Sequence, residues 1–287
     1  MTFHQYPTMY PKACTLNVKD LSRSIEFYED VLGFVLHEEK DRSVMLGTEK
    51  VKDLLTLVET EAMKENKKRM VGLYHVALLL PGRKDLALFV KHLDELGITF
   101  SAGDHLVSEA IYFSDPDGHG IEVYADRPAS SWEWRGKEVV MNTLPVDFAS
   151  LLSLPSEGEK WHQLPEGTVL GHLHFQVKNL EEHQRFYREG LGYDLVSQLG
   201  QEAMFLSDSD YHHHIAFNTW ANFYLEAEKD RDVGMRTFHL AVASRERQEE
   251  IGTRLKQLGY TVDREGDTLV TYDPANIEVR LTLDEKE

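Results

Sequence analysis

The chain has 287 residues, with 31 Lys and Arg against 49 Asp and Glu, a formal charge of −18, 41% hydrophobic residues, 14 histidines and one cysteine. This length allows one large domain or two domains of the usual size, each able to bury its own core. The negative charge argues against nucleic acid or an anionic membrane surface as a partner, because binding to phosphates depends on Lys and Arg.

The N-terminal segment and the apolar runs argue against export or membrane insertion. Residues 1–13 lack both the basic and the apolar region of a signal peptide. The longest aliphatic run, Val76 to Leu80, is far too short to span a bilayer. Cys14 has no second cysteine with which to form an internal disulfide. We therefore expect a soluble cytoplasmic protein in which Cys14 is a small buried residue.

A repeat divides the chain into two halves. Residues 21–34 and 180–193 align at a constant offset of 159 residues and share Leu, Phe-Tyr and Leu-Gly at the same positions. Each copy predicts an amphipathic helix that ends at a glycine in the left-handed conformation. An apolar strand precedes each helix and three alternating segments follow it, so each copy predicts a strand, a helix and three strands.

A second type of unit follows each copy. Residues 73–97 and 238–259 each predict a strand and a helix that ends at a glycine, and further strands joined by an Asp-Pro turn come next. Four βαβββ units predict an α+β fold, with an N-terminal pair of units in residues 1–127 and a C-terminal pair in residues 167–287. Residues 128–166 contain four of the nine prolines and little periodicity, so we interpret them as a linker.

The order of these units resembles the vicinal oxygen chelate superfamily, which includes glyoxalase I, the bleomycin and fosfomycin resistance proteins and the extradiol dioxygenases. The resemblance covers nearly the whole chain outside the linker. It implies that the four βαβββ modules form two cupped mixed sheets. It also implies that a cup holds a divalent metal and a substrate that chelates the metal through neighbouring oxygens. The fold alone does not select one of these activities.

Three strands present polar side chains where the superfamily places metal ligands. In the strand that begins at His172, the period of two puts His172 and His174 on one face and apolar residues on the other. The resemblance implies that His75, Glu122 and His172 bind the metal. Two imidazoles and one carboxylate leave three coordination positions open on iron. Any one of these histidines, taken alone, could instead be a hydrogen-bonded core residue.

The residue types also predict which units share the metal. Ala13 stands in unit one, and Thr237 in unit four, where units two and three have the candidate histidines. His239 lies two residues out of register. Units two and three together supply the complete set. We therefore expect a site that draws on both halves of the sequence rather than on two consecutive units.

The residues before Glu122 resemble the second half of an extradiol dioxygenase active site. His105 follows a Gly-Asp pair, and Tyr112 precedes Glu122 by ten residues. In that family a histidine after a glycine and a tyrosine at this distance hydrogen-bond the bound catechol. The resemblance therefore implies these roles for His105 and Tyr112. A plain strand aromatic is the alternative interpretation of Tyr112.

A run of three histidines follows in the third unit. Residues 211–216 resemble the strand on which the extradiol enzymes carry a histidine that acts as acid and base. The alignment favours His213, and a regular strand would turn His212 and His214 to the opposite face. A solvated or structural cluster is the alternative interpretation of this run.

Together these resemblances imply an Fe(II)-dependent extradiol dioxygenase of the catechol 2,3-dioxygenase type, with Mn(II) as an alternative metal. A small aromatic diol and O2 would be its substrates. His213 would move the proton, which suits an imidazole that titrates near neutral pH. Many relatives assemble into oligomers, so the resemblance also implies a homo-oligomer.

Two other functions stay open. A glyoxalase-like metal-dependent isomerase or lyase usually presents a fourth protein ligand, a glutamate on the final strand of the partner unit, but residues 215–220 contain no acidic residue. A metal-free binding protein of the resistance type would leave His75, Glu122 and His172 unexplained. Metal content and ring cleavage distinguish the three functions.

The remaining aromatic and imidazole side chains carry weaker signals. We expect the tryptophans of the linker, Trp132, Trp134 and Trp161, to pack between the halves or to cover the cup. We expect a surface position for the scattered histidines, which are His4, His37, His92, His119, His162 and His183.

Overall fold

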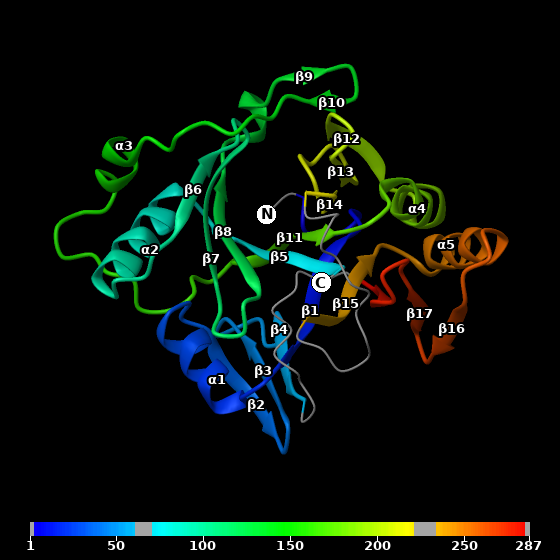
Figure 1. Ribbon diagram of the computed structural model, residues 1–287, viewed down its shortest axis with the longest axis horizontal. Coiled ribbons are helices and arrows are strands. Elements are labelled where there is room, and N and C mark those ends of the chain that lie inside the picture. Colours follow the sequence, from blue (N-terminus) through cyan, green and yellow to red (C-terminus); the bar gives the residue numbers. More distant parts are fainter. Residues whose placement is uncertain (1–2, 61–70, 221–233, 285–287) are drawn as a thin grey trace.

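Four units of one strand, a helix and three strands follow one another, and the computed structural model describes residues 3–60, 71–220 and 234–284 (Figure 1). Unit one consists of β1 (Tyr10–Val18), α1 (Leu21–Asp30), β2 (Val35–Lys40), β3 (Ser43–Gly47) and β4 (Leu55–Glu59). Unit two consists of β5 (Gly72–Leu79), α2 (Arg83–Glu95), β6 (Ser101–Asp104), β7 (Ser108–Ser114) and β8 (Gly120–Asp126).

The second half of the chain repeats this order. Unit three consists of β11 (Val169–Gln176), α4 (Leu180–Gln184), the π-helical turn η2 (Arg185–Leu191), β12 (Asp194–Leu199), β13 (Ala203–Ser207) and β14 (Ile215–Asn218). Unit four consists of β15 (Gly234–Val242), α5 (Arg245–Gln257), β16 (Val262–Glu265), β17 (Thr268–Tyr272) and β18 (Glu278–Leu283).

Local sequence explains where the helices begin and end. Asp20, Asn179 and Ser244 cap α1, α4 and α5, because their side chains accept hydrogen bonds from backbone N–H groups of the first turn. The helix that starts at α4 ends at Gly192, whose φ of 95° lies in the left-handed region that favours glycine. The predicted helix with a glycine end is therefore present, although its second half is a π-helix.

The strands form two eight-stranded sheets that combine units from both halves of the chain. The first sheet has the order β16-β17-β18-β15-β1-β4-β3-β2, and the second has the order β12-β13-β14-β11-β5-β8-β7-β6. Their central neighbours, β1 with β15 and β5 with β11, run antiparallel. Units one and four thus share one sheet, and units two and three share the other. The predicted α+β fold with two cupped mixed sheets is confirmed.

The main core lies between the two sheets. Leu173 and Phe175 on one face of β11 are buried there, together with Val177 just after the strand, and the ring of Phe175 lies 5.6 Å from the ring of Phe238 on β15. Cys14 on β1 is buried in the same core, as expected. Because side chains alternate along a strand, the opposite face of β11 points into the hollow of the second sheet.

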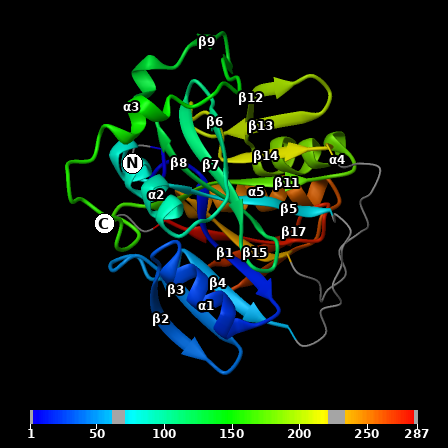
Figure 2. The same ribbon diagram turned by 60° about the vertical axis from the view of Figure 1, so that its left-hand side comes forward.

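The second sheet is strongly curved around that hollow. Strands β6, β7 and β8 rise on one side and β12, β13 and β14 on the other, with β5 and β11 between them (Figures 1 and 2). The cup therefore receives side chains from the first strand of two units that are far apart in the sequence.

The segment predicted as a linker contains short elements of its own. Trp132 packs against Tyr211 with ring centroids 5.8 Å apart, and Trp161 packs against Phe89 on α2 with centroids 5.0 Å apart. Both tryptophans are buried, whereas Trp134 is partly exposed. The segment is thus held against unit two and the cup. Its elements are η1 (Ala129–Ser131), β9 (Trp134–Arg135), β10 (Glu138–Val139) and α3 (Phe148–Leu152).

The expectation of a surface position is wrong for three of the scattered histidines. His4, His119 and His183 are buried. In each case a ring nitrogen reaches an acceptor inside the fold, which offsets part of the cost of burial. His4 contacts the Gly171 carbonyl oxygen at 2.7 Å, and His119 contacts the Asp115 carboxylate at 2.6 Å. No helix in the described part of the chain is both long and apolar enough to cross a membrane.

Candidate active site

Three neighbouring strands bring the predicted ligands together. The strand register sets Glu122 of β8 beside Ala77 of β5, and His172 of β11 beside the same alanine on its other side. His75 precedes Ala77 by two residues and so points to the same face of β5. Because the alanine carries only a methyl group, space remains between the three larger side chains.

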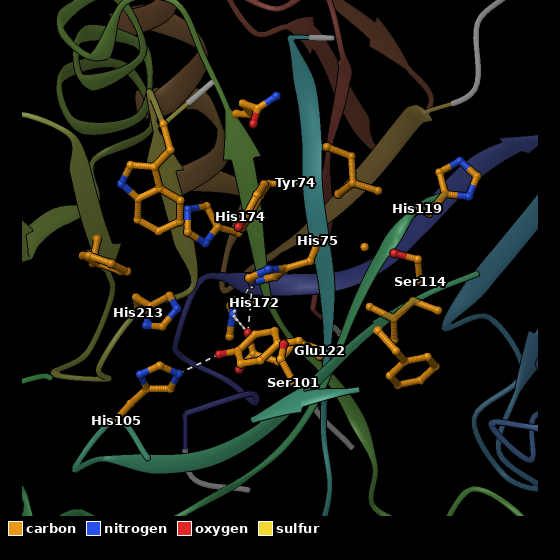
Figure 3. Close-up of a pocket in the computed structure, with 18 of the residues that line it drawn as sticks. Tyr74, His75, Ser101, His105, Ser114, His119, Glu122, His172, His174 and His213 are labelled. Atoms are coloured by element: carbon orange, nitrogen blue, oxygen red, sulfur yellow. Dashed lines mark hydrogen bonds and ion pairs between the residues drawn. The ribbon is translucent and has the colours of Figure 1, made fainter. Parts of the chain in front are cut away.

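The three ligand atoms form a small triangle (Figure 3). His75 Nε2 lies 2.9 Å from Glu122 Oε2, His172 Nε2 lies 3.1 Å from the same oxygen, and the two Nε2 atoms are 3.3 Å apart. An octahedral ion with bonds of about 2.1 Å needs adjacent ligand atoms about 3.0 Å apart. The triangle therefore fits one face of such an ion, and these residues could hold a divalent metal.

The protonation states also suit a metal. Burial lowers the pKa of His172 to about 4, although Glu122 acts in the opposite direction. Burial raises the pKa of Glu122, but His172 and His75 outweigh burial and hold that pKa well below its usual range. His172 is therefore neutral beside an ionised carboxylate at neutral pH, as metal ligation requires.

The register also identifies the residue of unit three that corresponds to Glu122 of unit two. We call its position the fourth corner of the candidate site. Glu122 pairs with the residue two positions after His75, and the residue two positions after His172 is His174. His174 pairs with Ala216 of β14, so Ala216 is the counterpart of Glu122 in unit three. An alanine offers no ligand atom, so this corner of the candidate site stays open.

The first sheet lacks this constellation. Its positions equivalent to the two histidines hold Ala13 and Thr237. The positions equivalent to Glu122 hold Thr56 and Arg280. Thr56 pairs with the residue two positions after Ala13, and Arg280 pairs with the residue two positions after Thr237. Within the described ranges, the second sheet alone brings together three ligating side chains in this way.

A cavity of about 1090 Å³ opens above the triangle. Polar side chains of all the proposed site residues reach it, together with His174. Apolar side chains form much of the remaining wall. These apolar residues include Val107, Ile121, Met141, Leu199, Phe205 and Trp220.

Tyr112 and His105 form a hydrogen-bonded pair on the cavity wall. Tyr112 lies directly across from Glu122 in the β7–β8 ladder. His105 Nδ1 is 3.0 Å from the Asn142 carbonyl oxygen, which can only accept, so Nδ1 carries the ring proton. His105 Nε2 then accepts the 2.6 Å hydrogen bond from the Tyr112 hydroxyl. Burial, assisted by Glu122, raises the pKa of Tyr112 well above its usual value, so the phenol stays neutral.

His213 reaches the cavity from unit three. Its ring centroid lies 4.1 Å from that of His172, whereas His214 turns away and contacts the Phe3 carbonyl oxygen. Burial, assisted by His172, lowers the pKa of His213 well below its usual value.

The expectation that residues 211–216 form one strand is wrong. Ser209 and Asp210 have φ angles of 60° and 58°, a left-handed turn that a strand cannot contain, and β14 begins only at Ile215. Even so, His213 faces the cavity and His214 turns away from it, as strand alternation predicts. His212 contacts His213 instead of facing away from it.

Sequence reasoning missed two residues of the cavity. His174 faces the cavity beside His172, and Asn218 donates to its Nε2 at 3.0 Å. The period of two had placed His174 on this face without a role. Asn142 comes from the aperiodic segment between the halves, where no repeat or motif pointed to the cup.

Comparisons with known proteins agree with this architecture. The family profile described as "Glyoxalase/Bleomycin resistance protein/Dioxygenase superfamily" matches residues 11–123 and 169–277. A catechol-2,3-dioxygenase of Bacillus subtilis (strain 168) is 38% identical over 265 residues, which cover 91% of this chain and 92% of that protein. A glutathione transferase FosA of Serratia marcescens is 24% identical over 110 residues, 38% of this chain and 76% of that protein.

A solved structure shares the fold at low sequence identity. Glyoxalase I from Zea mays superimposes with a TM-score of 0.56 and 16% identity, over 99% of this chain and 95% of that chain. The likeness concerns the fold alone. Because the family profile matches both halves and the Bacillus relative matches nearly the whole length, this chain belongs to the glyoxalase/bleomycin resistance protein/dioxygenase superfamily.

Proposed function

We propose that this protein is an Fe(II)-dependent extradiol dioxygenase that opens the aromatic ring of a catechol with O2, with Mn(II) as an alternative metal. The reaction class is that of the catechol-2,3-dioxygenase with which it shares 38% identity over 91% of the chain. The observation that carries the proposal is the buried triangle of His75, Glu122 and His172 at the floor of the cavity.

The ligand set supports the choice of metal. Two imidazole nitrogens and one carboxylate oxygen on one face are typical of non-haem Fe(II) sites with open positions. When bound, the metal would hold the catechol and O2 close together and carry electron density from the ring to oxygen. The triangle of His75, Glu122 and His172 would keep the metal at the cavity floor.

Tyr112 and His105 would orient the diol. The Tyr112 hydroxyl donates its proton to His105 Nε2, so its oxygen keeps lone pairs that can accept a hydrogen bond from a catechol hydroxyl. The His105 bond to Asn142 fixes this direction. The pair thus recognises a hydroxyl group close to Glu122.

His213 would act as the acid and base. It is a neutral imidazole on the cavity wall, in contact with His172 and close to Phe205, whose ring centroid is 5.2 Å away. A neutral imidazole can take the proton of a catechol hydroxyl and return it later in the reaction. Its position beside the metal ligands brings it within reach of a chelated substrate.

The size of the cavity favours a substituted ring. At about 1090 Å³ it slightly exceeds ordinary ligand pockets, which range from about 300 to 1,000 Å³. The apolar wall around Phe205 and Trp220 suits an aromatic or alkyl substituent.

The open corner argues against a glyoxalase-like isomerase. Such an enzyme would use a carboxylate at the position of Ala216, and the alanine supplies none. The three open positions instead match a reaction in which a bidentate diol and O2 both approach one metal.

The test is anaerobic reconstitution with Fe(II), followed by catechol and substituted catechols in air. We expect a yellow ring-cleavage product, measured by its visible absorbance and by oxygen uptake, and no product from the Glu122→Gln variant. Absence of colour with all diols, together with isomerisation of the methylglyoxal–glutathione adduct, would contradict the proposal. A homo-oligomer and a cytoplasmic location stay predictions.

A further inference from the structure

A chain of three hydrogen-bonded side chains leads from the cavity to the end of β8. His213 Nδ1 lies 2.8 Å from His212 Nδ1, and His212 Nε2 lies 2.9 Å from Asp126 Oδ1. His212 is fully buried and His213 is 8% exposed. Asp126 is the last residue of the strand that also carries Glu122. The chain is therefore anchored on the same strand as a candidate metal ligand.

The carboxylate at one end decides which nitrogens carry protons. An ionised carboxylate only accepts hydrogen bonds, so His212 Nε2 carries the proton that it donates to Asp126. In the neutral ring, His212 Nδ1 then has a lone pair and accepts from His213 Nδ1–H. His213 Nε2 is left with a lone pair.

The free nitrogen of His213 is the one available to the cavity. Within residues 3–60, 71–220 and 234–284, His213 makes no hydrogen bond other than the one to His212, so its Nε2 has no partner. His213 lines the cavity, whereas His212 and Asp126 do not. The two outer residues thus lie behind the cavity wall, although the His212 ring also approaches that of the candidate ligand His172, with centroids 6.4 Å apart.

Neighbouring aromatic rings hold the hydrogen-bonded series of Asp126, His212 and His213 in place. The His212 ring lies 4.0 Å from that of Tyr211 and 5.2 Å from that of Trp132. Trp132 donates from Nε1 to the carbonyl oxygens of Val107 and Arg127, so the indole has a fixed orientation. This packing restricts rotation of the His212 ring about its own bonds.

We propose that Asp126 and His212 are positioning residues that hold His213 as the Nδ1–H tautomer, with the lone pair of Nε2 turned to the substrate. The inference rests on the proposed function, because it assigns His213 as the base of that reaction. The new element is that the Asp126 carboxylate, acting through His212, sets the orientation and the tautomer of the His213 ring. This resembles in principle the way an aspartate orients a histidine in a catalytic triad.

Two substitutions of Asp126 separate the hydrogen bond from the bulk of the side chain. Asp126→Leu removes the acceptor, so His212 can take the other tautomer and donate to His213 Nδ1. That change puts the proton of His213 on Nε2. Asp126→Asn keeps an acceptor oxygen for His212. We expect Asp126→Leu to lower kcat about 10- to 100-fold with KM for the catechol and iron content unchanged, and Asp126→Asn to stay within about threefold of the wild type.

A double-mutant comparison excludes a merely structural effect. In the His213→Ala background, Asp126→Leu should cause no further loss of kcat, because the residue that it positions is gone. The matched control is Asp208→Leu, in the loop that carries His212 and His213, since Asp208 binds the Met9 N–H and Arg247 and does not contact His213. We expect Asp208→Leu to lower the unfolding temperature and to leave kcat unchanged. An equal loss from Asp126→Leu with and without His213 would overturn the proposal.

Neutron diffraction of the Fe(II)-loaded protein at pH 7 locates the protons of His212 and His213 directly, without any measurement of turnover. We expect deuterium on His212 Nε2 and on His213 Nδ1, and none on His213 Nε2. Deuterium on His213 Nε2 in the wild type would overturn the inference even if the enzyme cleaves catechol. Conversely, a protein that shows these deuterium positions but cleaves no catechol would contradict the proposed function. The tautomer assignment would then still stand.

Discussion

At the scale of single residues, hydrogen-bond partners decide what each cavity side chain can do. Asn142 and Asp126 lie outside the triangle of ligands, yet they fix which nitrogens of His105 and His212 carry protons. Tyr112 depends on this arrangement, because its hydroxyl donates to His105 and keeps its oxygen free to accept. The chemistry of the site thus follows from partners as much as from residue types.

Replacement of Tyr112 by phenylalanine tests this account. We expect kcat for ring cleavage to fall about two- to tenfold while iron content stays at the wild-type level, because the variant loses the oxygen that accepts a hydrogen bond from a catechol hydroxyl. Steady-state kinetics with measured iron content check this. The control is Tyr28→Phe, which loses a buried hydrogen bond to Asp115 away from the triangle. An unchanged kcat in Tyr112→Phe would show that the phenol does not act on the substrate.

At the scale of strands, the register around each central strand determines the ligand set. Unit two has Glu122 at the position where unit three has Ala216, although the strands around them pair alike. The two units therefore differ at one corner of the site. The proposed function uses this open corner for the substrates.

A glutamate introduced at Ala216 should close that corner. We expect Ala216→Glu to keep its metal and to lose at least about tenfold in kcat, because a fourth protein ligand would occupy a position that the substrates need. Iron analysis and oxygen uptake measure the two effects, and thermal unfolding shows whether the variant folds. Thr56→Glu places the same side chain at the equivalent position of the first sheet and should leave turnover unchanged. Full activity in Ala216→Glu would argue against an open corner.

Local sequence patterns predicted the strands and the units, but not every contact in the site. The offset of 159 residues and the period of two predicted the four units and the polar face of His172, because both depend on local pattern. The presence of candidate ligands in units two and three predicted the pairing that the strand order shows. Local pattern could not predict the hydrogen bonds of Asn142 and His212, because each joins residues that lie far apart in the sequence.

At the scale of the whole molecule, the fold buries many histidines in one region. His4, His172, His174, His213 and His214 are all buried, and burial lowers the pKa of each. The folded protein therefore keeps these rings neutral at a pH where the unfolded chain would protonate them. Stability from this source is present above about pH 6.5 and is lost as the pH falls toward 4.

The metal-free protein should show this dependence in urea unfolding. We expect its free energy of unfolding to fall between pH 6.5 and 4.5, with His4, whose pKa is lowered to about 4, contributing about 2 kcal/mol of that fall. Asp273, whose pKa burial raises to about 6, acts in the opposite direction, but it is one group against several. His4→Gln can still donate to the Gly171 carbonyl and should flatten the curve. The same slope in His4→Gln would contradict this origin.

The central claim is that one metal is held by residues from both halves of the chain, and iron content after anaerobic reconstitution tests it most directly. We expect His75→Ala and His172→Ala each to retain less than about a tenth of the wild-type iron, because each loses one of three ligands. His239→Ala, on the first sheet, should retain full iron. Retention of iron by His75→Ala, or its loss from His239→Ala, would contradict a site shared between units two and three.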